Sequence, residues 1–139
     1  TGWVHIMFSY KGSTTTQHLY YNNSEDLNSS TNSGGDIEYT APEHHFLALD
    51  GADSKFDGDI ADFWMSHEYI DLSVAGNRAL FIDAGGKPVD LGATGTNPGK
   101  TPIAYFSGAV ASWHTNKGTG EGFTVNGTAL SEASTSPSD

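Results

Sequence analysis

The chain has 139 residues and no cysteine, and its 17 acidic residues outnumber the six basic ones to give a formal net charge of −11. The length fits one domain, and the absence of cysteine excludes disulfides and thiolate chemistry. The negative charge disfavours nucleic acid and anionic membrane surfaces, because both are bound mainly through Lys and Arg. No apolar run approaches the roughly 20 residues of a membrane span. An excess of acidic residues favours a domain that stays dispersed in solution through charge repulsion, or one whose carboxylates bind Ca²⁺.

Short β-branched or aromatic runs separated by Gly, Ser, Thr, Asn and Asp predict an all-β sandwich or barrel. The first run, "WVHIMFSY" at 3–10, has apolar residues in both alternating sets, so we expect this strand to be covered on both sides or to lie near the centre of its sheet. "KGST" predicts a turn, and "TTQHLYYN" at 15–22 predicts the return strand. The polar run at 22–35 predicts a long surface loop.

Further along the chain, "DIEYT" at 36–40, "HHFLALDG" at 44–51 and "PIAYFSG" at 102–108 predict strands. "FTVNGTAL" predicts a hairpin, because Asn126-Gly127 suits the positive φ angles of a type I′ turn. We expect residues 1–130 to form one module and 131–139, which have little apolar content, to form a flexible tail.

A short helix is predicted near 72–82, within "DLSVAGNRALFIDAGGK". Asp71 or Ser73 is suited to cap its start, and Gly85-Gly86 to end it. Gly76 is unfavourable in a helix interior, which is why the helix is expected to be short.

The stretch "FDGDIADFWMS" at 56–66 has two interpretations. In the favoured one, a bulge near Asp62 lets a strand turn its apolar side chains to the core and its first aspartates to solvent. The core side chains would be Ile60, Phe63 and Met65, and the solvent-facing ones Asp57 and Asp59. In the other, a loop of carboxylates binds Ca²⁺. Its ligands would be Asp50, Asp53, Asp57 and Asp59, although the spacing does not match an EF-hand and Lys55 would repel a cation.

Two segments carry a resemblance to laminin-G-like, concanavalin A-like jelly-roll modules. "GWVHIMFSYKGSTTTQHLYYNN" resembles the family segment W-H-H-V-A-V-T-Y-D-G followed by a strand ending L-Y-V-N-G; the matching residues are Trp3, His5, Phe8, Tyr10, Gly12, Leu19 and Tyr20. "FDGDIADFWMS" is similar to F-x-G-x-I-D-E-V-R-I-Y; the matching residues are Phe56, Gly58, Ile60, Phe63 and Met65, while Ala61 replaces the first acid. The C-terminal half resembles the ends of concanavalin A-like proteins encoded by tailed bacteriophages and prophages.

The resemblance implies an antiparallel β-sandwich, with the family's short helical turn falling at 71–82. The first half of a complete jelly roll is not evident before Trp3, so we expect the family's N-terminal strands to be missing or supplied by another chain. The implied function is non-enzymatic: a structural, decoration or fibre-associated module of a bacteriophage virion. Such a module contacts other virion proteins, copies of itself or host-surface glycans, and is extracellular as part of the particle.

Two other functions come from the residues themselves. "SWHTNKGTGEG" could present a sugar-stacking ring and polar partners, which would make the chain a carbohydrate-binding lectin, with or without Ca²⁺. The candidate contacts are Trp113, His114, Asn116 and Lys117. A glycoside hydrolase is a remote alternative, because the strand motifs E-x-D-x-x-E and E-x-D-x-E of glucanases with this fold do not occur. Apart from Ca²⁺, no cofactor is expected.

Overall fold

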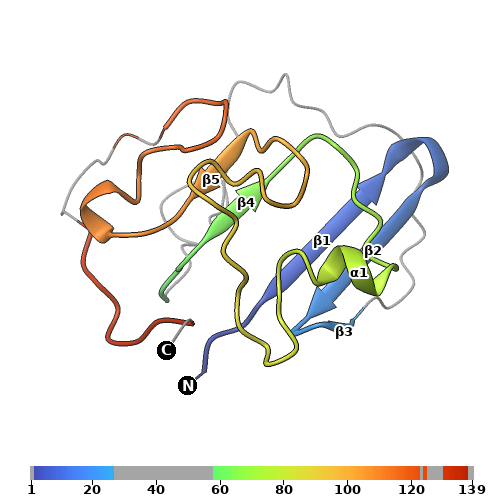
Figure 1. Ribbon diagram of the computed structural model, residues 1–139, viewed down its shortest axis with the longest axis horizontal. Coiled ribbons are helices and arrows are strands. Elements are labelled where there is room, and N and C mark those ends of the chain that lie inside the picture. Colours follow the sequence, from blue (N-terminus) through green and yellow to red (C-terminus); the bar gives the residue numbers. More distant parts are fainter. Residues whose placement is uncertain (1, 27–57, 123, 125–129, 138–139) are drawn as a thin grey trace, which may run out of the picture.

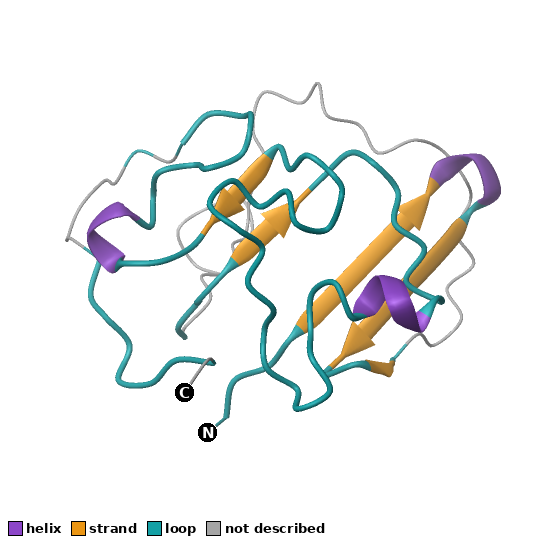
Figure 2. Cartoon of the chain, viewed as in Figure 1, coloured by secondary structure: helices purple, strands orange, loops and turns teal. Residues whose placement is uncertain are grey.

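The computed structural model describes residues 2–26, 58–122, 124 and 130–137, which form a mostly β structure with two small antiparallel sheets and one short helix (Figures 1 and 2). The strands are β1 (Ile6–Lys11), β2 (Thr16–Tyr21), β3 (Ser24–Glu25), β4 (Phe63–Met65) and β5 (Ala104–Phe106), and the helix is α1 (Ala75–Arg78). Two 3₁₀ turns cover Gly12–Thr14 and Val110–Ser112. The strands predicted at 36–40 and 44–51, and the Asn126-Gly127 turn, lie outside the described residues.

The first sheet has the order β1-β2-β3, with both pairs antiparallel. The Gly12–Thr14 turn joins β1 to β2 and ends at Thr15, which has a positive φ of 55°. Asn22 and Asn23, also at positive φ, join β2 to β3. Asparagine tolerates this left-handed backbone better than most residues, and such turns match the twist of paired strands. The return strand predicted at 15–22 is therefore confirmed, and a third, very short strand follows it.

One face of this sheet packs on the segments that flank α1, and the helix lies in front of β1 and β2 in Figure 1. The buried cluster on this face consists of Met7, Tyr20, Leu72 and Ile82, with Ile70 and Phe81 packed against it. The opposite face is different: Ile6 is 65% exposed and Phe8 58%. The prediction that this strand is covered on both sides is therefore wrong. Successive side chains of a strand alternate between faces, and the segments that flank α1 cover one face alone.

The second sheet pairs β4 with β5, placing Phe63 opposite Phe106 and Met65 opposite Ala104. The ring centroids of Phe63 and Phe106 lie 6.3 Å apart, and Phe106 is 1% exposed. Trp64 points elsewhere: its ring meets Phe81 edge-on at 5.0 Å. Because Phe81 also packs against the first core, these aromatic contacts join the two sheets.

The acidic stretch forms a shorter strand than the sequence predicts. Phe63 and Met65 are half-buried in β4, as expected, and Asp59 is exposed, as expected. Ile60 precedes the strand and is 37% exposed, so its predicted place in the core is wrong. Asp57 lies outside the described residues. The residues before Phe63 have no strand partner in the described part, which leaves nothing to hold Ile60 in register with the core face.

The helix is confirmed in place but is shorter than predicted. Its N-cap position is Val74, which makes no side-chain capping bond. The Asp71 carboxylate instead accepts hydrogen bonds from the Ser73 backbone and hydroxyl, at 3.0 and 2.6 Å. Such local bonds compete with helix formation. Gly85 and Gly86 fall in a later turn rather than at the helix end, so the predicted cap and stop are both wrong.

Candidate functional site

The predicted sugar-stacking residue, Trp113, is half-buried behind β5. It follows the Val110–Ser112 turn, its indole N–H donates to the carbonyl oxygen of Ala61, and its ring centroid lies 5.6 Å from that of Phe106. The indole N–H and ring of Trp113 therefore make contacts inside the protein, to Ala61 before β4 and to Phe106 in β5.

Asn116 bonds the loop to β5 through both ends of its amide. The side-chain oxygen accepts from the backbone N–H of Tyr105 at 2.8 Å and of Gly118 at 2.9 Å. The side-chain nitrogen donates to the carbonyl oxygens of Ile103 at 2.8 Å and Glu121 at 3.2 Å. One amide thus satisfies four backbone groups, which is the role of a loop-fixing residue.

Residues 117–120 complete this attachment along the outer edge of β5. The Lys117 backbone N–H donates to the Tyr105 carbonyl at 2.8 Å, and the Gly120 N–H to the Ile103 carbonyl at 2.9 Å. A Cβ at Gly118 or Gly120 would lie 2.7 or 2.8 Å from a carbonyl oxygen of the neighbouring backbone. These glycines are required because only they let the two backbones approach so closely.

The Lys117 side chain also has an intramolecular role. Its ammonium donates to the Ser107 hydroxyl at 2.8 Å and lies 5.6 Å from the centroid of the Tyr105 ring. Desolvation raises the pKa of the Asp62 carboxyl above its usual value, and the positive charge of Lys117 partly opposes that rise. His114 is half-buried. The structure therefore brings the four predicted sugar contacts into one loop but engages three of them inside the protein; carbohydrate binding stays a prediction.

The predicted Ca²⁺ ligands are mostly outside the described part of the chain. Asp50, Asp53 and Asp57 lie there, and Asp59 is described as exposed. Within residues 2–26, 58–122, 124 and 130–137, no three His, Asp or Glu side chains are placed to hold a metal ion. The Ca²⁺ site stays a prediction.

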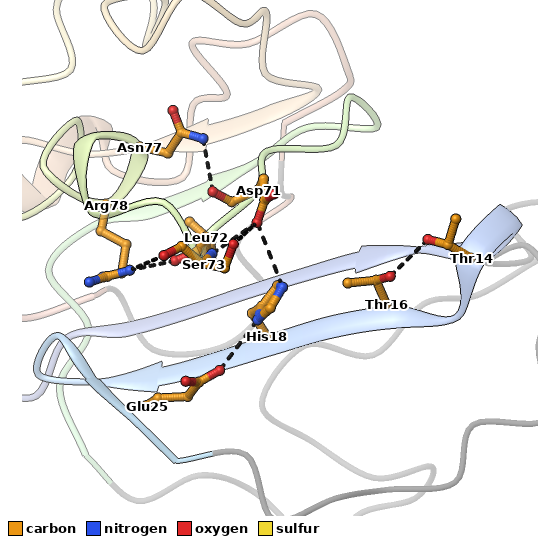
Figure 3. Close-up of polar contacts among 9 residues, drawn as sticks. All are labelled: Thr14, Thr16, His18, Glu25, Asp71, Leu72, Ser73, Asn77 and Arg78. Carbon is orange, nitrogen blue, oxygen red and sulfur yellow. Dashed lines mark hydrogen bonds and ion pairs between the residues drawn. The ribbon is translucent and has the colours of Figure 1, made fainter.

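A polar network that the sequence did not indicate lies between the first sheet and the loop before α1 (Figure 3). His18 is at its centre: its Nδ1 lies 3.3 Å from Glu25 Oε1 and its Nε2 lies 3.7 Å from Asp71 Oδ1. The three residues come from β2, β3 and the loop before α1. The sequence held one indication of this position: His18 is two residues from Tyr20 in the predicted strand, so the two side chains lie on the same face.

This geometry makes His18 a link rather than a general base. A catalytic histidine presents one ring nitrogen to the reacting group, whereas both nitrogens of His18 face carboxylates. Its side chain is only 16% exposed. Hydrogen bonds from Ser73 lower the pKa of Asp71, and the positive charge of protonated His18 contributes to the same shift. The network fastens the helix loop to the sheet.

Arg78, at the end of α1, fastens the same loop from the other side. Its Nε donates to Asn23 Oδ1 at 2.7 Å, and a terminal nitrogen donates to the carbonyl oxygens of Leu72 and Ser73 at 2.7 and 3.1 Å. Its guanidinium carbon lies 4.4 Å from the centroid of the Tyr20 ring, within cation–π range. Arg78 therefore ties α1 to the β2–β3 turn.

Two polar atoms, one just before β1 and one within it, are buried without a hydrogen-bond partner in the described structure: His5 Nδ1 and Ser9 Oγ. Burial lowers the pKa of His5 below its usual 6.5, because the charged ring would lose hydration. His5 and Ser9 are four residues apart, so roughly 13 Å of extended chain separates them. They do not form a common site.

The uncovered face of the first sheet carries exposed apolar side chains, which we call the apolar stripe: Val4, Ile6, Phe8 and Tyr21, at 42%, 65%, 58% and 48% exposure. Ile6 lies directly opposite Tyr21 in the ladder. Beside them is a depression of about 240 Å³ lined by Tyr21, Ser24, Glu25 and Asp26. That volume is below the usual range for small-molecule pockets.

Comparisons with protein-family models, curated proteins and solved structures each found no match. Among the described residues, no helix has the length and apolar character needed to cross a bilayer.

Proposed function

We propose that this chain is a non-enzymatic contact module of a bacteriophage virion, acting as a structural, decoration or fibre-associated component. The observation that carries the proposal is the apolar stripe on the first sheet. We also propose that the two antiparallel sheets are parts of a concanavalin A-like β-sandwich. In support, β4 falls in the segment that resembles the family's F-x-G-x-I strand, and α1 falls within the helical turn expected after it.

The stripe supports protein contact because its side chains are large, apolar and contiguous. Isolated exposed apolar residues are normal, but a continuous apolar patch costs solubility and marks an interaction surface. Ile6 and Phe8 lie two residues apart on one face of β1, and Tyr21 faces Ile6 from β2. Burying such area contributes roughly 25 cal/mol per Å². A partner that covers the stripe therefore gains affinity without any polar recognition.

The virion context has a different support, the resemblance of two segments to laminin-G-like modules and of the C-terminal half to phage-encoded proteins. The lectin alternative has weaker support, because Trp113, Asn116 and Lys117 already make internal contacts. A sugar would have to bind beside these contacts without breaking them.

Mass spectrometry of purified particles, from a phage or prophage carrying the coding sequence, tests the proposal. We expect the chain in the particles, and we expect the double variant Ile6→Ser, Phe8→Ser to be incorporated at least tenfold less. The matched control replaces two exposed apolar residues away from the stripe, Val74→Ser and Leu130→Ser, and should be incorporated normally. Absence of the wild-type chain from the particles, or hydrolysis of a polysaccharide by the purified chain, would refute the proposal.

A further inference from the structure

We infer that the partner protein docks by adding an extended strand along the free edge of β1, with apolar side chains placed beside Ile6 and Phe8. The inference rests on the proposed function, because it uses the same part of the sheet, and it names the mode of contact and the chemistry of the partner. A free strand edge offers unpaired backbone N–H and C=O groups, and an extended segment of another chain satisfies them by enlarging the sheet.

The backbone groups of Ile6 and Phe8 point away from β2. The Asn22 N–H donates to the His5 carbonyl oxygen at 2.8 Å, so these two residues form a hydrogen-bonded pair of the antiparallel ladder. Such pairs alternate with pairs whose N–H and C=O groups face outward. Ile6 and Phe8, one and three residues further along, belong to the outward-facing set. β1 is an end strand of its sheet (Figure 1), and no hydrogen bond within the described part of the chain reaches these outward groups.

The β1 edge lacks the features that usually protect a strand edge from pairing. Proteins keep such edges short, place a bulge, a proline or a charged side chain in them, or cover them. β1 is six residues long, pairs with β2 without a bulge, and has its one charged residue, Lys11, at the end. The opposite edge, β3, is only two residues long, and residues 117–120 cover the outer edge of β5. Among the described edge strands, β1 is therefore the longest.

The exposed side chains on this edge define what the added strand should carry. Ile6 is 65% exposed and Phe8 58%, both on the uncovered face. In an antiparallel hydrogen-bonded pair the opposite residue has its Cα about 5.5 Å away and its side chain on the same face. Apolar residues at every second position of the added strand would therefore pack against Ile6 and Phe8 as cross-strand pairs. The net charge of −11 favours a segment flanked by Lys or Arg, because opposite charge speeds encounter.

Amide hydrogen exchange, followed residue by residue by NMR, tests whether the edge is free in the isolated chain. The amides of Ile6 and Phe8 should exchange at least tenfold faster than those of Met7 and Ser9, which face β2 in the ladder. Equal protection of all four amides would overturn the inference, because another part of the same chain would then already occupy the edge.

A synthetic peptide serves as the probe for the added strand. It has about ten residues, alternates valine with threonine between terminal lysines, and carries a fluorescein label. Fluorescence anisotropy should show binding at about 10–100 µM, and bound peptide should slow exchange of the Ile6 and Phe8 amides at least fivefold. The same peptide N-methylated at alternate residues cannot complete the ladder and should bind at least tenfold more weakly. Absence of binding up to about 1 mM, or equal binding of both peptides, would overturn the inference.

Two substitutions at one position separate strand addition from contact with the apolar stripe alone. Phe8→Ser removes the ring and keeps the outward N–H, whereas Phe8→Pro removes both without breaking a bond to β2. We expect Phe8→Ser to weaken peptide binding about threefold and Phe8→Pro at least tenfold beyond that. The control Val74→Ser should stay within twofold of wild type. Equal weakening by serine and proline would contradict strand addition. Thermal unfolding checks each variant, and the N-methylated peptide gives the same test if Phe8→Pro does not fold.

The inference and the proposed function fail separately. A chain that binds the peptide along β1 but is absent from the particles retains strand addition without the virion function. A chain whose incorporation into particles depends on the side chains of Ile6 and Phe8, but whose edge binds no peptide, retains that function without strand addition.

Discussion

Replacing Asn116 with alanine should destabilise the protein by an amount that the structure allows to be estimated. The substitution removes four hydrogen bonds at once. The Ile103 carbonyl keeps the bond that it accepts from Gly120. The backbone N–H groups of Tyr105 and Gly118 lose their acceptor, and both bonds are partly buried. The main cost is therefore the two unsatisfied donors.

A buried donor left without an acceptor costs ~1–3 kcal/mol, so the two together cost about 3 kcal/mol when discounted for partial exposure. For a chain of this size, that loss lowers Tm by roughly 9 °C. Tyr105 is central to β5 and only 5% exposed, so water does not readily replace the lost acceptor there.

Urea unfolding followed by tryptophan fluorescence measures the change, with calorimetry for Tm. Asn97→Ala is the matched control, because that side chain is exposed and its amide makes one hydrogen bond, to the Asp90 carbonyl. We expect the control to cost about 1 kcal/mol or less. If Asn116→Ala cost no more than Asn97→Ala, the loop would not be held by this amide, and its role at β5 would have to be abandoned.

Three further changes have signs fixed by the structure. Gly118→Ala should lower the free energy of unfolding in urea by about 1–3 kcal/mol, because its Cβ would lie 2.7 Å from the Pro102 carbonyl oxygen. Gly76→Ala, in open space within α1, should instead raise it by ~0.5–1 kcal/mol. Equal effects would contradict the close approach of the Gly118 backbone to Pro102. The unfolding free energy should fall as the pH drops below about 6.5, because burial lowers the pKa of His5 in the folded chain and the unfolded chain then binds more protons. His5→Phe should flatten this dependence of the unfolding free energy on pH. An unchanged slope would exclude His5 as its source. Desolvation raises the pKa of Asp62, so ionisation of its carboxyl destabilises the fold as the pH rises through that pKa. Asp62→Asn should therefore raise Tm at pH 7 but not at pH 3. A lower Tm of the variant at pH 7 would refute this account of Asp62.

Strand patterns were the reliable part of the prediction. The alternation in 3–10 and the turn after it led to β1 and β2 as observed, and the aromatic runs at 63–65 and 104–106 formed β4 and β5. These are local properties, since a period of two residues and a turn sequence act within a few residues. The helix was placed correctly but its caps were not, because Asp71 bonds to Ser73 instead of capping α1.

The candidate site was less predictable, because its residues acquire their roles from distant partners. Asn116 was predicted to contact sugar and instead bonds to β5, eleven residues away. His18 carried no distinctive motif, and its position between Glu25 and Asp71 depends on how the loop before α1 folds back on the sheet. A loop asparagine for binding and one for fixing a strand look alike in a sequence.

The sequence by itself determined that this is a cysteine-free, acidic, mostly β chain with short strands, because composition and period-two alternation act on each residue independently of its distant neighbours. Tertiary structure alone decided which face of β1 is covered. Met7 and Ile6 are both apolar neighbours in one strand, yet the segments that flank α1 bury Met7 and leave Ile6 exposed. The hydrophobic effect favours burial of both and does not distinguish the faces; packing of a segment some 65 residues away does.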